Sequence, residues 1–373
     1  MTINRDVANL VSRTNKISRN HVYPLVMNGD MRVAQRGTSA TGVGASNSYV
    51  TVDRFRHNFA NTAGRLTSTQ STDVPTGQGF KHSLKLDCTT ADTSIAANEF
   101  GQIYQSFEGQ DLSLFNKGTA DCTTWCVIFW AKGTAKTYAL ELYDSDNNRQ
   151  ITKLFTVTTD WKKHVINFPA DTSTSDDFNY DNDQSFMINF GIHMGSDVTS
   201  GTLNTDSWAD ATSANRYAGI DSFFDSTSNE LYLTGVQLEL GNYAEGTEPE
   251  FQFVDHATQL RMCQRYAQVV CNGDDQFIGN GFFFQSDYIF VQLHLKNAMR
   301  TAPTATVTTV SSGFAANTNS GTDEFDGFDG IAHAHSMGAA IFTDGENVSS
   351  TSGDTCMCRT NHADVSIVLS ADL

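Results

Sequence analysis

The chain has 373 residues, with 24 Lys and Arg against 42 Asp and Glu, which gives a formal net charge of −18. A surface this acidic repels nucleic acid and anionic membranes, so neither is expected as a partner. No stretch approaches the ~18 consecutive apolar residues that span a bilayer. The first residues, MTINRDVANL, also lack the apolar core of a signal peptide. We therefore expect synthesis in a cytoplasm, with no membrane insertion and no export by the standard route.

The composition favours β structure. Phe (25) and Tyr (11) are frequent, whereas Pro (5) and charged residues (18%) are scarce. Aromatic residues and Thr favour strands, while Asn, Asp and Gly favour turns. The 7 cysteines are odd in number and spread along the chain, which favours free structural thiols over a disulfide framework.

Residues 1–24 are predicted to form a basic arm at the head of an acidic chain. Apolar residues recur there at heptad spacing for about two heptads, and these candidate trimer contacts are Ile3, Val7, Leu10 and Ile17. The arm has one acidic residue, Asp6, against four basic residues that could dock on a partner, namely Arg5, Arg13, Lys16 and Arg19. A frayed polar terminus is the alternative.

Residues 25–249 read as a series of short strands separated by polar turns. The candidate strands begin near Met31 and Tyr49 and continue at 82–88, 99–107, 123–131, 137–143, 151–157, 161–168, 185–192 and 231–240. Many short strands with turn signals between them indicate a jelly-roll β-sandwich. Residues 196–230 form a longer loop rich in Ser, Thr and Asp.

A short helix is predicted within 250–268. Its apolar face has spacings of 4, 3, 3 and 4, given by Phe253, Ala257, Leu260, Cys263 and Ala267. Strand patterns then resume at 277–284, 287–295, 304–310, 331–342 and 363–369. Residues 269–373 therefore predict a second, smaller β-sandwich domain.

Seven segments in this order carry a family resemblance: NGDMRVAQRG, TVDRF, FGQIYQSFEG, WCVIFWAKG, DWKKHVINFP, TGVQLELG and CQRYAQ. Over about residues 25–310 the chain resembles a family of phage virion proteins of the tail-fibre or head-fibre type. TGVQLELG resembles the strand that ends their carbohydrate-binding-module-like jelly roll. CQRYA resembles the helix, usually Cys-Gln-Arg-Tyr-Tyr, that leads into their C-terminal β domain.

The chain departs from this family in two places. Ala267 stands where the second Tyr is usual, and the loop after Gly241 is more acidic. The resemblance implies a structural protein of the virion, a homotrimer that contacts other tail or capsid proteins. It leaves the attachment site and the receptor open.

No catalytic motif is evident. The sequence has no nucleophile elbow, phosphate-binding loop or zinc-protease helix. Carboxylates such as Glu99, Glu108, Asp144 and Asp221 are abundant, but nothing in the sequence places any pair in a common cleft. We expect a protein that is not an enzyme, and a phage polysaccharide depolymerase is the alternative.

Glycan binding is the favoured ligand chemistry. Jelly rolls bind sugars with exposed aromatic rings and nearby polar groups. Trp208 lies in the polar segment TDSWADA and is the predicted glycan-binding residue, whereas Trp125, Trp130 and Trp161 lie in strands and are expected in the core.

No cofactor is expected, but two metal sites are possible alternatives. His333 and His335 would share one face of a strand, and in a three-fold assembly they could bind iron. Asp and Asn oxygens in the loops 144–148 or 176–183 could hold calcium. A third cluster, Cys356, Cys358 and His362, lacks the fourth ligand of a structural zinc site.

Overall fold

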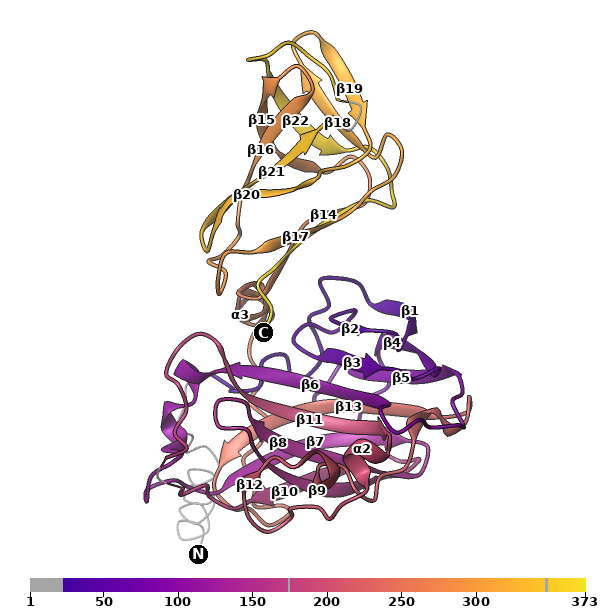
Figure 1. Cartoon of the computed structure of the whole chain (residues 1–373), viewed down its shortest axis with the longest axis vertical. Helices are drawn as coiled ribbons and strands as arrows, with labels where there is room; N and C mark the ends of the chain where they lie inside the picture. Colours follow the sequence, from indigo (N-terminus) through magenta and orange to yellow (C-terminus); the bar gives the residue numbers. More distant parts are fainter. Residues whose placement is uncertain (1–22, 174, 346–347) are drawn as a thin grey trace, which may run out of the picture. The chain divides into compact units, whose positions relative to one another are not determined.

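The computed structural model describes residues 23–173, 175–345 and 348–373 and divides into two compact units (Figure 1). Unit 1 extends to Gln259 and includes Leu373, and unit 2 extends from Leu260 to Asp372. The predicted arm, apart from residues 23 and 24, lies outside the described residues.

Unit 1 contains two antiparallel sheets within the described residues. Sheet A consists, from edge to edge, of β1 (Ser39–Val43), β4 (Arg65–Ser71), β5 (Ser83–Thr90), β13 (Glu230–Leu240), β7 (Trp125–Gly133) and β10 (Lys162–Phe168). Sheet B consists of β12 (Ala209–Asp210), β9 (Arg149–Val157), β8 (Lys136–Asp144), β11 (Gln184–Met194), β6 (Phe100–Glu108), β3 (Arg56–Ala60) and β2 (Asn47–Ser48). The connecting segments form η1 (Gly109–Asp111), η2 (Ser113–Phe115), α2 (Ser196–Thr199), η3 (Ser213–Asn215) and η4 (Phe223–Asp225).

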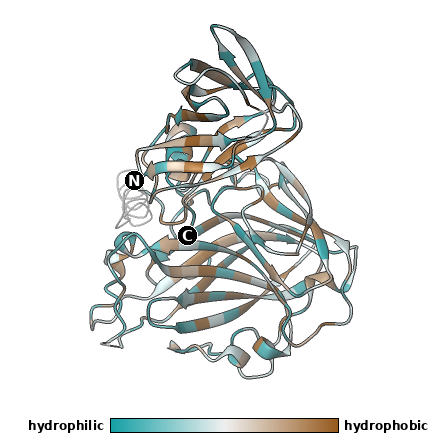
Figure 2. Cartoon of the chain, turned by 45° about the horizontal axis from the view of Figure 1, so that its top comes forward, coloured by the Kyte–Doolittle hydropathy of each residue, from teal (hydrophilic) through white to brown (hydrophobic). Residues whose placement is uncertain are grey.

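The core of unit 1 lies between the two sheets. Because successive side chains of a strand point to opposite faces, β7 places Trp125, Val127 and Phe129 in this core. Ile128 and Trp130 then point to the outer face of sheet A. Hydrophobic and hydrophilic residues alternate along many strands in Figure 2. The predicted jelly-roll β-sandwich is confirmed.

The helix between the two β regions is shorter than predicted. It extends over α3 (His256–Gln264), whereas its predicted apolar face spans Phe253 to Ala267. Phe253 lies before the helix and packs on Phe80 and Phe251, with centroid distances of 5.3 and 4.8 Å. At the other end, Ala267 already begins a strand. Within the described residues, no helix is long and apolar enough to cross a membrane.

Unit 2 also contains two antiparallel sheets in its described part. Sheet C consists of β14 (Ala267–Asn272), β23 (Ser366–Ser370) and β17 (Thr304–Thr308). Sheet D consists of β19 (Gly321–Phe325), β18 (Phe314–Thr318), β22 (Thr355–Thr360), β15 (Phe277–Gln285), β16 (Tyr288–Leu293), β21 (Gly338–Asp344) and β20 (Gly330–His335). A separate cluster of buried residues from both sheets forms the core, which confirms the second, smaller β domain.

Candidate functional site

A groove of about 420 Å³ lies on the outer face of sheet A. Four aromatic side chains line it, and together they define the aromatic groove: Phe80, Trp130, Phe251 and Phe253. Phe80 contacts Phe251 edge to face, with 5.0 Å between centroids. Phe253 is 44% exposed, and Trp130 is half-buried. The volume falls within the ~300–1,000 Å³ that is typical of ligand sites.

A bulge in β13 shapes the floor of the groove. The pairing of β13 with β7 shifts register between Thr234 and Gln237, and Gly235 between them has φ +64°. A Cβ on Gly235 would lie 2.6 Å from Cζ of Phe80 and 3.0 Å from Cδ1 of Trp130. The glycine therefore permits both the backbone turn and the close approach of the two rings.

Charged groups occupy one side of the groove. Lys163 forms an ion pair with Glu248, and its ammonium lies 5.7 Å from the centroid of Trp130. Burial raises the pKa of Glu248, but hydrogen bonds from Lys163 and from backbone N–H groups outweigh it, so the pKa falls below its usual value. Glu248 is therefore ionised near neutral pH.

Gln237 leaves a hydrogen-bond acceptor unused in the groove wall. Its Nε2 donates to the carbonyl oxygen of Pro249 at 3.0 Å. Its Oε1 is buried and has no hydrogen-bond partner among the described residues. Because a buried polar atom without a partner is costly, a donor supplied by a ligand would relieve this acceptor.

The outer face of sheet A carries a second aromatic cluster, formed by Tyr232 of β13 and by Trp161 just before β10. The rings of Trp161 and Tyr232 meet edge to face at 6.1 Å. Trp161 Nε1 donates to Oδ1 of Asp73 at 2.9 Å, and Lys132 reaches Oδ2 of the same carboxylate at 2.5 Å. Tyr232 is opposite Lys132, and two residues along the ladder Thr234 is opposite Trp130. This cluster therefore continues the row of side chains that leads into the aromatic groove.

The predicted exposure of Trp208 is wrong. Trp208 is 7% exposed and belongs to the core of unit 1. Its ring meets Trp125 at 5.1 Å, and its Nε1 donates to the carbonyl oxygen of Pro169 at 2.9 Å. The polar residues around Trp208 in the sequence do not expose the indole, because the segment folds it back between the sheets.

The outer face of sheet B is closed by the chain itself. Arg216 binds both carboxylate oxygens of Glu141, at 2.6 and 2.7 Å. The hydroxyl of Tyr217 lies 2.6 Å from Oε1 of Gln102 and 2.5 Å from Oε2 of Glu141. Tyr217 is fully buried, and Gly191 leaves room for its ring. Sugar-binding residue types are present on this face, but the segment after α2 already occupies them.

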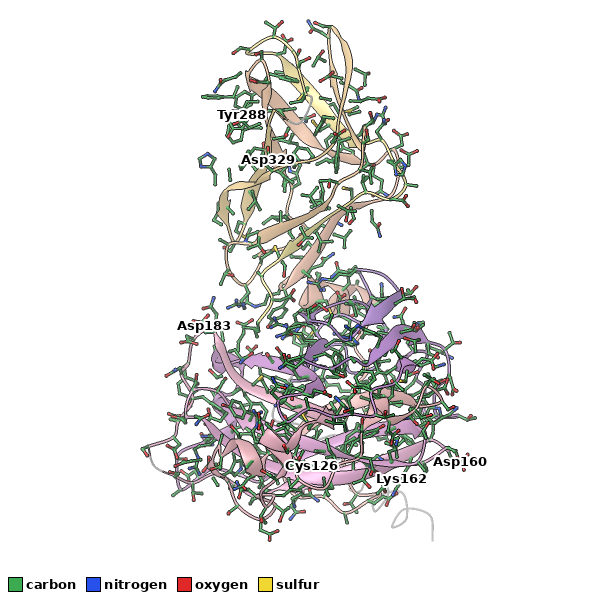
Figure 3. The ribbon with its side chains drawn as sticks, turned by 45° about the vertical axis from the view of Figure 1, so that its right-hand side comes forward. Cys126, Asp160, Lys162, Asp183, Tyr288 and Asp329 are labelled. Carbon is green, nitrogen blue, oxygen red and sulfur yellow. The ribbon has the colours of Figure 1, made fainter. Side chains whose placement is uncertain are left out.

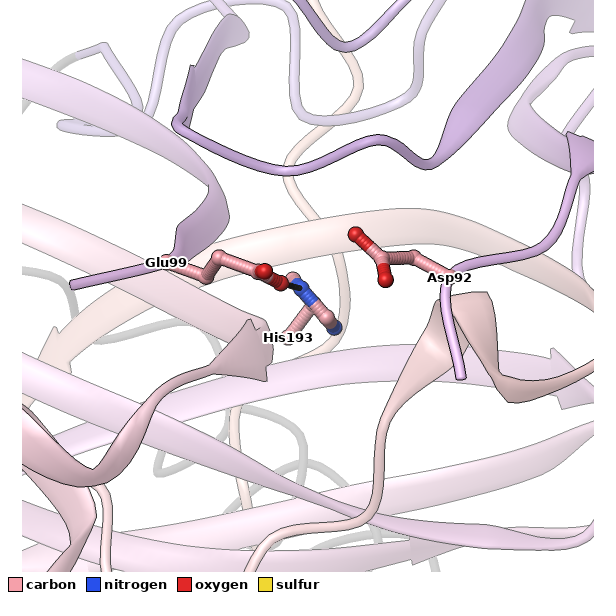
Figure 4. A group of neighbouring side chains, drawn as sticks. All are labelled: Asp92, Glu99 and His193. Carbon is pink, nitrogen blue, oxygen red and sulfur yellow. Dashed lines mark hydrogen bonds and ion pairs between the residues drawn. The ribbon is translucent and has the colours of Figure 1, made fainter. Parts of the chain in front are cut away.

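One buried cluster combines Asp92, Glu99 and His193 (Figure 4). Among the described residues it is the one group of three or more His, Cys, Asp or Glu whose ligand atoms all lie within 4.8 Å of one another. His193 Nε2 lies 2.8 Å from Glu99, and Nδ1 lies 2.7 Å from the hydroxyl of Ser222. Both ring nitrogens therefore have protein partners, and the cluster is satisfied without a metal.

Lys117 lies beside the 144–148 loop, one of the two loops predicted as alternative calcium sites. The ammonium of Lys117 is fully buried and lies 2.5 Å from Asp144 and 3.2 Å from Asp171. It also donates to the backbone carbonyl of Asp176. Arg149 binds Asp171 through two nitrogens at 2.9 Å each. Lys117 therefore neutralises Asp144 of the 144–148 loop, and Lys117 and Arg149 together neutralise Asp171.

His333 and His335 both line a cavity of about 360 Å³ in unit 2. A register shift between Ala332 and His335 separates them, and His333 has φ +50°. They belong to no described cluster of three ligands. Iron at a three-fold axis stays a prediction.

The predicted docking and trimer residues cannot be placed, because they lie outside the described residues. These are the docking residues Arg5, Arg13, Lys16 and Arg19 and the trimer contacts Ile3, Val7, Leu10 and Ile17.

The residues of the aromatic groove were missed, although one signal could have revealed Trp130. Trp125 and Trp130 are five residues apart in one strand, so they must point to opposite faces. Phe80, Phe251 and Phe253 carried no such signal, since they lie in segments between regular elements.

The comparisons with known proteins concern only the fold. No protein-family model and no curated protein matches the chain. Among solved structures, the enzymatically active domain of tailspike protein 4 from Bacteriophage CBA120 is similar at 13% identity and a TM-score of 0.30, covering 58% of this chain and 21% of that chain. The chain thus matches about a fifth of that tailspike domain.

Two carbohydrate-binding modules are similar over nearly their whole length. A CBM4 module has 11% identity and a TM-score of 0.28, covering 57% of this chain and 97% of the module. The family 11 module of a cellulosomal cellulase from Clostridium thermocellum has 9% identity and a TM-score of 0.29, covering 61% of this chain and 99% of the module. Likenesses at these TM-scores carry no conclusion about ligand or activity.

Proposed function

We propose that the chain is a non-enzymatic structural protein of a phage virion, and that unit 1 binds host cell-surface glycan in the aromatic groove. The ordered segments of the family resemblance support the virion assignment. The lining of the groove supports the ligand class.

The observation that carries the glycan assignment is the pairing of aromatic rings with an unused acceptor. Trp130 and Phe253 offer ring surface to the apolar face of a sugar. The free Oε1 of Gln237 accepts from a sugar hydroxyl. The ion pair of Lys163 and Glu248 offers both donors and acceptors to further hydroxyls.

Glu248 lacks the raised pKa that the general acid of a glycosidase needs. A glycosidase needs a carboxylic acid whose pKa is raised so that it can protonate the leaving oxygen. The pKa of Glu248 is lowered instead. If the chain were a depolymerase, incubation with host polysaccharide would release reducing ends, and we expect none.

The virion role includes assembly as a homotrimer, with the basic arm docking on other tail or capsid proteins. The heptad spacing and the charge of residues 1–24 support this part. Light scattering of the purified chain should give the mass of a trimer. A stable monomer would refute the trimer but leave the groove untouched.

Replacing Trp130 tests the groove. Retention of the chain on immobilised host polysaccharide should weaken about tenfold or more in Trp130→Ala, because the variant loses the stacking surface. Trp161→Ala is the matched control, since it removes an indole from the same sheet face but outside the groove. Equal retention of wild type and Trp130→Ala would reject the site.

A further inference from the structure

Unit 2 carries a cavity of about 510 Å³ on the outer face of sheet D. Three phenylalanines line it, and together they define the unit 2 aromatic cavity: Phe282, Phe284 and Phe290. Phe283 between the first two points inward and is fully buried. The alternation of β15 therefore places two large apolar rings on the outside of a domain that has its own core.

The three rings combine one stacked pair and one nearly perpendicular pair. Phe282 and Phe290 are stacked, with centroids 6.0 Å apart and planes at 29°. Phe284 stands at 82° to Phe290, with 6.1 Å between centroids. Phe282 is 45% exposed and Phe284 is 54% exposed. Tyr288, labelled in Figure 3, packs beside them at 5.0 Å from Phe290. Exposed apolar surface of this kind marks an interaction site.

Polar side chains surround the rings with unused hydrogen-bonding capacity. Asn280, Gln292, Thr355 and His333 all line the cavity. Within the described ranges, none of these four side chains makes a hydrogen bond to another residue. Two amides, a hydroxyl and an imidazole together supply both donors and acceptors.

The backbone at His333 turns its ring toward the cavity. His333 has φ +50°, in the left-handed region that non-glycine residues seldom adopt. The register shift in β20 accompanies it, and the ring lies 6.2 Å from Phe290. A backbone outlier at a cavity is a reason to ask what the side chain contacts there.

The absence of charged groups among the described lining residues favours a neutral ligand. Among the described residues that line the cavity there is no carboxylate, ammonium or guanidinium group. A charged ligand would be desolvated there without a counter-charge, whereas a hydrocarbon would leave four polar groups without partners. A neutral pyranose matches the lining, because its ring has an apolar face and its hydroxyls both donate and accept.

We infer that unit 2 holds a second glycan site, in which a neutral pyranose stacks on Phe282 and Phe290 and bonds the surrounding amides. This site is independent of the aromatic groove, which belongs to unit 1. The protein would then engage its glycan at two places.

The test uses the full chain carrying Trp130→Ala, which removes the main ring of the aromatic groove. Saturation-transfer NMR with the neutral methyl glycosides of glucose, galactose and mannose should show binding of at least one sugar. Adding Phe282→Ala should weaken that binding about tenfold. Adding Phe277→Ala is the matched control, because Phe277 lies on the same strand, is 51% exposed and does not line the cavity.

Three outcomes would overturn the second site: no transfer to any of the three sugars, equal loss in the Phe277→Ala control, or self-association that Phe282→Ala abolishes. The last would identify the face as an interface between copies of the chain. Failure of the proposed site in the aromatic groove gives a different result from these three outcomes. If wild type and Trp130→Ala bind equally and Phe282→Ala abolishes binding, the groove fails and the second site stands.

Discussion

At the scale of single residues, Lys117 holds together the loops at one end of unit 1. Its ammonium is fully buried beside Asp144 and Asp171. Removing one partner of a buried ion pair leaves an uncompensated charge, which costs more than the pair contributes. The positions of Asp144, Asp171 and Asp176 therefore depend on this side chain.

Lys117→Met should lower the free energy of unfolding by about 3–5 kcal/mol. Chemical denaturation of the full chain measures this change. Lys162→Met is the control, because Lys162 is exposed and its replacement should stay within about 0.5 kcal/mol. A Lys117→Met variant as stable as this control would contradict the account.

Buried histidines predict a pH dependence of stability. Burial lowers the pKa of His164 to about 4 from an ordinary 6.5, and burial also lowers that of His57 to about 4. The unfolded chain then binds more protons between pH 4 and 6.5, so stability is full above pH 6.5 and falls toward pH 4, by up to about 3 kcal/mol per histidine.

His164→Phe should flatten this dependence, because phenylalanine keeps the stacking on Phe129 and cannot take up a proton. Denaturation at pH 4.5 and at pH 7 measures the difference between the two conditions. If wild type and His164→Phe lose the same stability between these pH values, His164 does not titrate as described.

The tryptophans show what the sequence predicts at this scale and what it does not. Local polarity suggested that Trp208 was exposed, and a place in a strand suggested that Trp130 belonged to the core. Trp208 is in fact buried in the core, and Trp130 is half-buried on the outer face of sheet A. Burial of Trp208 depends on Trp125 and on Pro169, whose contact comes from chain folding rather than from neighbours in sequence. Strand alternation carries information about Trp130 that local polarity does not.

At the scale of elements, the bulge in β13 shapes the floor of the aromatic groove on sheet A. A straight β13 would continue its ladder with β7 through Gly235, whereas the bulge leaves Gly235 against the rings of Phe80 and Trp130. The strand itself was predicted at 231–240 and is observed at Glu230–Leu240. The bulge was not predicted, because a single glycine within a strand has several structural explanations.

Gly235→Ala should both destabilise unit 1 and weaken glycan binding. Gly42→Ala is the matched control, because Gly42 has φ +68° but has nothing within 4 Å of the added Cβ. The control should cost about 1 kcal/mol for the left-handed backbone alone. Gly235→Ala should cost about 1–3 kcal/mol more, from overpacking against Phe80 and Trp130. Equal costs in thermal unfolding would refute the packing role.

The segment after α2 illustrates what pattern analysis could not reach. Its polar composition predicted a loop, and it does connect strands with little regular structure. Its Arg216 and Tyr217 cover the outer face of sheet B. Glu141 is 75 residues from Arg216 in sequence, so no local pattern could pair them.

At the scale of the whole molecule, the described residues form two β units, and residues 1–22 of the predicted basic arm lie outside them. The β class of both units followed from strand periodicity. The oligomeric state did not follow from the sequence, because a heptad pattern of about two heptads is too short to define an oligomer.

Deleting residues 1–20 should leave both units folded but prevent incorporation of the protein into phage particles. Circular dichroism of the truncated chain checks folding, and immunodetection on purified particles checks incorporation. A charge-reversed arm, Arg13→Glu with Lys16→Glu, should show the same defect if docking is electrostatic. Normal incorporation of the truncated chain would remove the docking role.

The most direct measurement is a tryptophan fluorescence titration of the full chain with host surface polysaccharide. All four tryptophans precede Gln259 and lie in unit 1, so the signal does not depend on the unit 2 aromatic cavity. The account predicts a saturable change in emission that is lost in Trp130→Phe and kept in Trp161→Phe. An unchanged titration in Trp130→Phe, or none in wild type, would contradict glycan binding in the aromatic groove.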